Sequence, residues 1–178
     1  MNNYKFNFAN LHICTFAHPQ MKFLPKYIIT LLLITSVLSS CRQTELYEKD
    51  TVLPGYKWRS DFPVTGVFQI TDTTSLYNIY IVLRHTDAYA YNNIWLNVGL
   101  QAPGDSLQLQ KLNLSLGSDA QGWEGVGMND IREVRKLISG VPRRFLKTGE
   151  YRFSISQIMR DDPLEHVMNA GLRLEKAP

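Results

Sequence analysis

The residues with the clearest chemical signature lie near the start of the chain, where Cys41 directly follows a hydrophobic run. The residues before it are Leu38, Ser39 and Ser40, so the cysteine ends the sequence LSSC. An apolar residue and two small ones before a cysteine form the bacterial lipobox, because small side chains let a signal peptidase close around the bond. We predict that the Cys41 thiol takes a diacylglycerol and that its freed amine takes a further acyl chain. At about 0.8 kcal/mol for each buried CH₂, several long chains anchor a protein stably where one does not.

The segment before the cysteine, residues 21–40, has the order of a secretory signal. Lys22 and Lys26 give it a positively charged start, and the apolar core 28–38 follows. This core fits a signal peptide and is shorter than the roughly 20 residues that a membrane-spanning helix needs. Residues 1–20 contain no acidic residue and are predicted to be an over-extended upstream start. An ordinary cleaved signal followed by a buried cysteine is the alternative.

The composition of the chain limits its size, its partners and its use of cysteine. The 178 residues are 44% apolar and 20% charged, as in a single globular domain. Three of the 19 Lys and Arg residues precede Cys41, so the part after it carries 16 basic and 16 acidic residues. This balance gives no reason to expect a nucleic-acid partner. Two cysteines, Cys14 and Cys41, are too few for a disulfide framework.

Residues 41–63 are predicted to be a lipidated N-terminus and a tether, because they mix charges, prolines and a glycine without a clean period. Arg42 follows the cysteine, at the place where an enterobacterial inner-membrane lipoprotein carries a retention aspartate. We therefore expect a lipid-anchored protein of the cell envelope at the outer membrane. The periplasmic face and the surface face are both left open.

Residues 64–178 alternate between apolar and polar side chains with a period of two, which is typical of β-strands. The predicted strands are 64–70, 76–85, 94–101, 106–117, 150–158 and 170–176. Polar turns separate them, so we predict a mostly all-β domain built as an antiparallel β-sandwich, jelly-roll or immunoglobulin-like. The leucines of 106–117 change phase along the strand, which predicts a β-bulge near residues 110–111.

One short helix is predicted near residues 130–139. Asp130 can cap its start, with Glu133 three residues later, and Gly140 can end it. The apolar stripe of this helix would be Ile131, Val134 and Ile138.

The titratable side chains after Cys41 offer little catalytic chemistry. His85 and Asp87 would share a strand face as an acid–base pair, although a histidine hydrogen-bonded at a strand end is the favoured interpretation. Asp161 and Asp162 are candidates for acid–base work or calcium, but adjacent aspartates before a proline are more often a turn or a helix N-cap. We predict no enzyme, no metal site and no cofactor.

Aromatic side chains offer a second kind of site. Trp95 and Trp123, with Tyr89 and Tyr91, would form an interaction or ligand surface if they were exposed together, because aromatic rings stack on the apolar faces of sugars. The favoured interpretation of Trp123 is structural: the glycines of GWEGVG let it plug the end of the sandwich. A carbohydrate-binding surface or periplasmic lipoprotein is therefore the alternative function, and any small-molecule ligand is left open.

Three segments that follow the LSSC motif resemble one known family. They are YNIYIVLRHTDAYAYNNIWLNV, GWEGVGMNDIREVR and GEYRFSISQIMRDDPLEHVMNAGLRLEK. In this order they resemble the gliding-motility lipoprotein GldH family of the Bacteroidota, over about residues 41–176. The resemblance implies a membrane-anchored, non-catalytic component of the gliding or cell-envelope machinery. It implies interactions with the membrane through lipid and with other envelope proteins, and it carries no catalytic residues.

Overall fold

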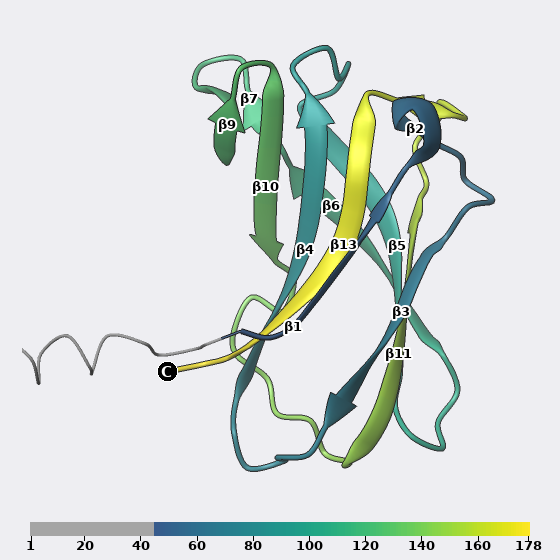
Figure 1. The fold of residues 1–178 in the computed structure, drawn as a ribbon, viewed down its shortest axis with the longest axis vertical. Coiled ribbons are helices and arrows are strands. Elements are labelled where there is room, and N and C mark those ends of the chain that lie inside the picture. The colour runs from purple at the N-terminus through teal and green to yellow at the C-terminus, as the bar shows by residue number, and fades with distance from the viewer. Residues whose placement is uncertain (1–44) are drawn as a thin grey trace, which may run out of the picture. The chain divides into compact units, whose positions relative to one another are not determined.

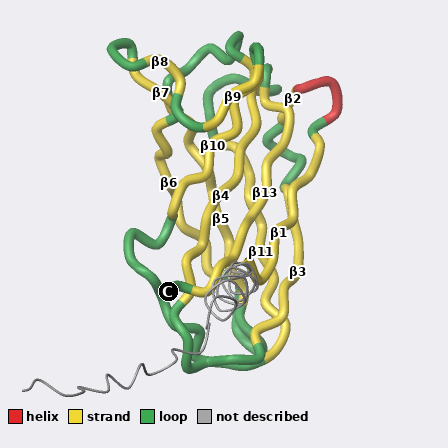
Figure 2. Tube along the Cα trace, turned by 60° about the vertical axis from the view of Figure 1, so that its left-hand side comes forward, coloured by secondary structure: helices red, strands yellow, loops and turns green. Residues whose placement is uncertain are grey.

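The computed structural model describes residues 45–178, which fold into two main antiparallel β-sheets packed face to face (Figure 1). The predictions for residues 1–44, including the signal segment and Cys41, lie outside the described residues. The predicted all-β sandwich is confirmed. Figure 2 shows strands through most of the described chain and one short helical segment, η1 (Pro54–Tyr56).

The larger sheet has five strands in the order β1-β13-β4-β10-β9. They are β1 (Glu45–Val52), β13 (Val167–Lys176), β4 (Tyr77–Thr86), β10 (Ile131–Leu137) and β9 (Val126–Met128). The smaller sheet has four strands in the order β3-β11-β5-β6. They are β3 (Val64–Ile70), β11 (Gly149–Gln157), β5 (Asn93–Gln101) and β6 (Gln108–Ser115). Two short pairs complete the described part: β2 (Lys57–Trp58) with β12 (Leu164–Glu165), and β7 (Gly117–Ser118) with β8 (Gly122–Trp123).

The core lies between the two sheets and is built from alternate residues of each strand. The inward residues of β4 are buried, as the period of two predicts: Tyr77, Ile79, Ile81 and Leu83. β5 and β11 contribute in the same way, with Ile94, Leu96, Val98, Tyr151, Phe153 and Ile155. Removing each such side chain from water favours folding by about 1.5–3 kcal/mol before the entropy of ordering it is counted.

The short helix predicted near residues 130–139 is wrong, because this segment forms strand β10. All seven of its residues pair with β4. A strand places Ile131 and Val134 on opposite faces, so the apolar stripe of the predicted helix does not form, and of these two only Val134 is buried. Without β10, one edge of β4 would leave its backbone N–H and C=O groups unpaired. Satisfying those groups outweighs the local helix preference of the sequence.

The bulge predicted near residues 110–111 is also wrong, since β6 pairs with β5 in unbroken register. Leu107 and Leu109 lie on the outer face instead, where they pack across Gly99. A Cβ added to Gly99 would come within 2.9 Å of a carbon of each leucine. The missing side chain therefore leaves room for two leucines outside the core, and the strand needs no change of register.

Most of the predicted tether is folded. β1 pairs with β13 along its whole length. The following residues, 53–63, pass through η1 and β2, where Leu53 and Trp58 are fully buried. The folded domain therefore begins by residue 45 and not at residue 64.

The two ends of the sandwich carry different loops. The basal end is the one at which β1 begins and β13 ends, and it carries the loops 71–76, 102–107 and 138–148. The opposite end, called distal, carries the segments 53–63, 87–92, 116–130 and 158–166. Figure 1 shows the C-terminus and the start of β1 in the lower half of the view, with the β10–β11 connection nearby.

Phe145 closes the basal end of the core. It lies in the loop 138–148, is only 6% exposed, and packs edge to face on three rings of the core. The distances from its ring centroid are 5.7 Å to Phe68, 5.2 Å to Tyr77 and 4.8 Å to Tyr151. The backbone of Arg143 also exchanges two hydrogen bonds with Tyr77, of 2.7 and 2.8 Å. Packing and backbone bonds together hold this loop in place.

Replacing Phe145 by alanine should lower the free energy of unfolding by about 3–5 kcal/mol, because it empties a ring-lined site that cannot fully collapse. Urea denaturation of the purified protein measures the loss. Leu146→Ala is the matched control in the same loop: Leu146 is 85% exposed, so its truncation should leave the urea midpoint nearly unchanged. Equal losses in the two variants would contradict the role of Phe145 as a plug.

Candidate functional site

The four aromatic residues considered from the sequence fall into two groups, not one surface. Tyr89 is 3% exposed and Trp123 is partly buried against the core. Both lie around the ring of His85, with centroid distances of 5.5 Å from His85 to Tyr89 and 4.7 Å from His85 to Trp123. Trp95 is 43% exposed on the outer face of β5, and Tyr91 is half-buried. The structure therefore does not bring the four rings to one exposed platform.

Glycines allow Trp123 to close the distal end of the core. A Cβ added to Gly117 would lie 3.1 Å from Cα of Trp123, the residue with which it pairs across the β7–β8 turn. Gly125 has φ +89°, and a Cβ there would meet the backbone of Glu133. At both positions another part of the backbone approaches too closely for any residue but glycine. Trp123 therefore packs against the end of the core, as the structural interpretation of GWEGVG predicted.

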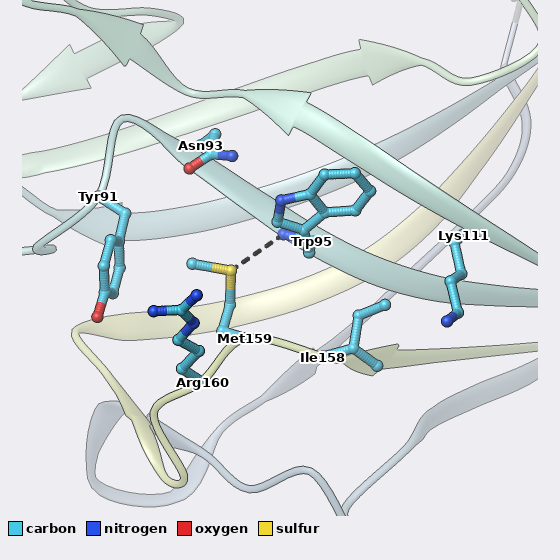
Figure 3. Close-up of a pocket in the computed structure, with 7 residues that line it drawn as sticks. All are labelled: Tyr91, Asn93, Trp95, Lys111, Ile158, Met159 and Arg160. Atoms are coloured by element: carbon cyan, nitrogen blue, oxygen red, sulfur yellow. Dashed lines mark hydrogen bonds between the residues drawn. The ribbon is translucent and has the colours of Figure 1, made fainter.

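Trp95 and Tyr91 line an open hollow of about 520 Å³ at the distal end (Figure 3). Its lining comes from β5, from β6, from the turn before β5 and from the residues after β11: Tyr91, Asn93, Trp95, Lys111, Ile158, Met159 and Arg160. The backbone N–H of Trp95 donates to the sulfur of Met159 at 3.2 Å, which ties the segment after β11 to β5. The indole thus stands on a sheet surface with polar and cationic groups around it.

Two cations beside the indole form no ion pair with a carboxylate of residues 45–178. Most Lys and Arg side chains between residues 45 and 178 form an ion pair, but no carboxylate of that range pairs with Lys111 or Arg160. The nearby Tyr91 hydroxyl donates to Oδ2 of Asp161 at 2.6 Å, and this hydrogen bond raises the pKa of Tyr91. The hollow is suited to binding a polar or anionic group against an aromatic ring.

His85 does not form the acid–base pair considered with Asp87. Its ring is 1% exposed, and Nδ1 donates to the Thr86 carbonyl oxygen at 2.9 Å. Its Nε2 has no partner among the described residues. The Asp87 carboxylate instead accepts from Arg132 at 2.8 and 3.1 Å. Burial lowers the pKa of His85 and outweighs the hydrogen bond to Thr86, so the ring is neutral inside the core.

Asp161 and Asp162 bind different partners and do not form a carboxylate pair. Asp162 accepts from the backbone N–H of Ser60 at 2.9 Å and from the Ser60 hydroxyl. These bonds lower the pKa of Asp162. The two aspartates tie the turn before Pro163 to its neighbours, as the turn interpretation predicted. In the described range, no three His, Cys, Asp or Glu side chains are grouped so that they could hold a metal ion.

A second exposed surface was missed by the sequence analysis. β9 is the edge strand of the larger sheet at the distal end, and its Val126 and Met128 are 81% and 78% exposed. The side chain of Arg132 covers Gly127 on the inner side, so both apolar side chains face outward. Only the alternation V-G-M signals this strand in the sequence, and three residues are too short for a period to be read.

Fold and site together define a β-sandwich domain whose exposed hollow and apolar edge are suited to binding. Within residues 45–178, no helix has the length and apolar character needed to span a membrane. A family model described as GldH lipoprotein matches residues 45–174, so this chain belongs to the GldH lipoprotein family. The resemblance read from the three sequence segments is confirmed.

Two relatives match nearly their whole length. The "Gliding motility lipoprotein GldH homolog" of Christiangramia forsetii is 27% identical over 158 residues, which cover 85% of this chain and 93% of the relative. The "Gliding motility lipoprotein GldH" of Flavobacterium johnsoniae is 28% identical over 153 residues, covering 82% of this chain and 94% of the relative.

Two solved structures show weak likeness to this chain. A family GH115 4-O-methyl-α-glucuronidase with specificity for decorated arabinogalactans aligns with a TM-score of 0.33 and 8% identity, over 78% of this chain and 18% of that one. Dimeric latent PorU from Porphyromonas gingivalis aligns with a TM-score of 0.30 and 12% identity, over 78% and 14%. This chain spans less than a fifth of either protein, and neither likeness supports a statement about function.

The stability of the protein should fall as the pH drops below 6.5, the ordinary pKa of histidine. The folded state holds His85 neutral, so between 6.5 and its lowered pKa the unfolded chain binds a proton that the folded chain does not. The free energy of unfolding should decrease by at most about 1.4 kcal/mol for each pH unit from this residue. Urea denaturation of the native protein and of His85→Gln, repeated from neutral to mildly acidic pH, measures the difference. Identical pH dependence in the two proteins would contradict it.

Proposed function

We propose that this protein is a lipid-anchored component of the bacterial cell envelope that serves gliding-motility machinery by binding other envelope proteins. Membership of the GldH lipoprotein family and the names of the two relatives support this role. The lipobox that ends at Cys41 supports the anchor, and Arg42 after it supports the outer membrane. A binding role in place of catalysis is supported by His85, Asp161 and Asp162, whose side chains are taken up in structural hydrogen bonds.

The position of β1 supports a short link between lipid and domain. Four residue steps separate Cys41 from Glu45, the first residue of β1. A chain spans at most about 3.6 Å for each residue, so the anchor lies within about 14 Å of that strand whatever path it takes. Lipid on Cys41 therefore holds the basal end close to the membrane and leaves the distal end accessible to partners.

The apolar edge at β9 carries the proposal that the protein acts by binding proteins. Val126 and Met128 are exposed at the end of the domain that points away from the proposed anchor. An edge strand with exposed apolar side chains favours contact with another protein, because its backbone groups and its side chains both gain partners there.

Carbohydrate binding at the Trp95 hollow is the second candidate function. The exposed indole supports it, and so do the neighbouring Lys111 and Arg160, which form no ion pair within residues 45–178. The burial of Tyr89 and the packing of Trp123 weaken it, because only one of the two tryptophans remains for stacking.

Replacing Cys41 by serine should move the protein from the membrane fraction to the soluble fraction and abolish its metabolic labelling with palmitate, because serine cannot form the thioether. Fractionation of cells that produce each variant measures this. Thr44→Ser, three residues further along the chain, is the matched control and should change neither result. Membrane association and labelling that persist in Cys41→Ser would overturn the anchor.

A photoreactive amino acid at Met128 should form one defined covalent adduct with another envelope protein in living cells. The matched control is Val67, which is 48% exposed on the outer face of β3 and belongs to neither proposed site. Mass spectrometry of the adduct identifies the partner. No adduct at position 128, together with glycan binding on an array that Trp95→Ala abolishes, would replace the protein-binding role with the carbohydrate-binding one.

A further inference from the structure

We propose that the loop 138–148 is a membrane-contact site, in which Val141 and Leu146 enter the lipid interface while Arg143 and Arg144 bind lipid phosphates. This inference rests on the lipid anchor of the proposed function. It adds a second attachment, made by the folded domain itself to the same membrane.

The loop lies at the end of the larger sheet where the chain emerges toward Cys41. Glu45 pairs with Glu175 in β13, and the neighbouring Lys176 pairs with Tyr77 in β4. Tyr77 in turn exchanges backbone hydrogen bonds with Arg143. Arg143 and Glu45 are therefore at the same level of the sheet, three strand spacings apart, which is about 14 Å. A lipid bound near one of them is close to the other.

The loop exposes apolar side chains that its own fold does not use. Leu146 is 85% exposed and Val141 is 64% exposed. Phe145 between them is buried in the core, so the backbone is held and Leu146 cannot turn inward without displacing the plug. Two neighbouring basal loops add Leu76 and Leu107, each 44% exposed. Apolar residues gathered at the end nearest to lipid favour transfer into the interface.

The charges of the basal loops select an anionic surface. Lys176 neutralises Asp72 at 2.9 Å, and Lys147 neutralises Asp105 at 2.6 Å. Arg143 and Arg144 are exposed, and no carboxylate in residues 45–178 forms an ion pair with either. The loops therefore present two free guanidinium groups whose charge is not offset by these aspartates. Guanidinium groups bind phosphate oxygens in pairs, as lipid headgroups offer them.

Because the lipid anchor already holds the protein at the membrane, the loop 138–148 needs only a weak affinity for the bilayer. Once a lipid holds the protein on the bilayer, the loop meets the surface within one molecule and pays no second cost of association. Each arginine near an anionic bilayer then strengthens the contact roughly fivefold. The distal end has exposed apolar residues as well, but it lies at the other end of the strands and cannot reach the same surface at the same time.

The test uses the full-length lipidated protein reconstituted into vesicles of phosphatidylethanolamine and phosphatidylglycerol. An environment-sensitive fluorophore is attached at Leu146→Cys, and in a separate protein at Val126→Cys as the distal control of similar exposure, 81%. Lipids with a quencher on their acyl chains should quench the probe at position 146, with a blue shift of its emission, and should leave the probe at position 126 unchanged.

Charge is tested in the same assay. The double substitution Arg143→Gln with Arg144→Gln should abolish most of the quenching at position 146, and vesicles of phosphatidylcholine alone should have the same effect. Lys111→Gln with Arg160→Gln is the matched control, because it removes two unpaired cations from the distal end. It should leave the quenching at position 146 as it is. Urea midpoints equal to that of the native protein show that each variant is folded.

Flotation of the vesicles separates the two proposals. A protein that floats with the vesicles but shows no quenching at position 146 overturns the loop contact and leaves the anchor standing. Equal quenching at positions 146 and 126 also overturns it. A protein that does not float overturns the anchor, and the loop contact falls with it.

Discussion

Strand β4 is the element on which the rest of the structure depends, because both of its edges are paired and each of its ends positions a loop. β13 and β10 satisfy its backbone groups on the two sides. Its inward residues supply the centre of the core, and on its outer face Val82 is only 5% exposed. At the basal end Tyr77 holds the loop that contains Arg143, and at the distal end Thr86 pairs with Ile131 beside β9. The positions of both proposed contact surfaces, the loop 138–148 and the edge at β9, therefore depend on this one strand.

Strands with one buried face could be predicted from the sequence, because burial of one face makes apolar and polar side chains alternate. β4, β5 and β11 follow that rule, and the predicted strands 76–85, 94–101 and 150–158 match them to within one residue at each end. β10 does not, since its apolar residues also fit a helical spacing and only pairing with β4 decides between the two. β1 looks like a linker because Glu48, Lys49 and Asp50 are charged, yet charges are what an edge strand carries to avoid pairing with other chains. Long-range pairing, which a local pattern cannot show, explains both failures.

The sequence showed which aromatic residues could form the candidate site, but it did not show which of them are exposed. Tyr89 and Tyr91 lie in the connection before β5 and Trp123 lies in the two-residue strand β8, and such segments have no period from which inward and outward positions follow. Trp95 lies on the outer face of β5 between the buried Ile94 and Leu96, a position that follows from the alternation of this strand. The packing of Trp123 against the core depends on Gly117 and Gly125. Their lack of a side chain matters only because another strand lies against each of them, which the local sequence does not show. The apolar edge at β9 is only three residues long, so composition carries no signal for it.

The two ends of the domain differ in their distance from the proposed anchor, and this difference gives the molecule a direction. Both ends expose apolar side chains and cations that form no ion pair within residues 45–178, but only the basal end includes the start of β1. A domain on a long tether tumbles and presents a binding edge in every direction, at low effective concentration toward a partner on one side. With lipid on Cys41 as proposed, only four residue steps separate the anchor from β1, so this end of the domain stays within about 14 Å of the lipid. Pairing of β1 with β13 then matters for function as well as for stability, because it replaces most of a flexible linker with a rigid part of the sheet that begins close to the membrane.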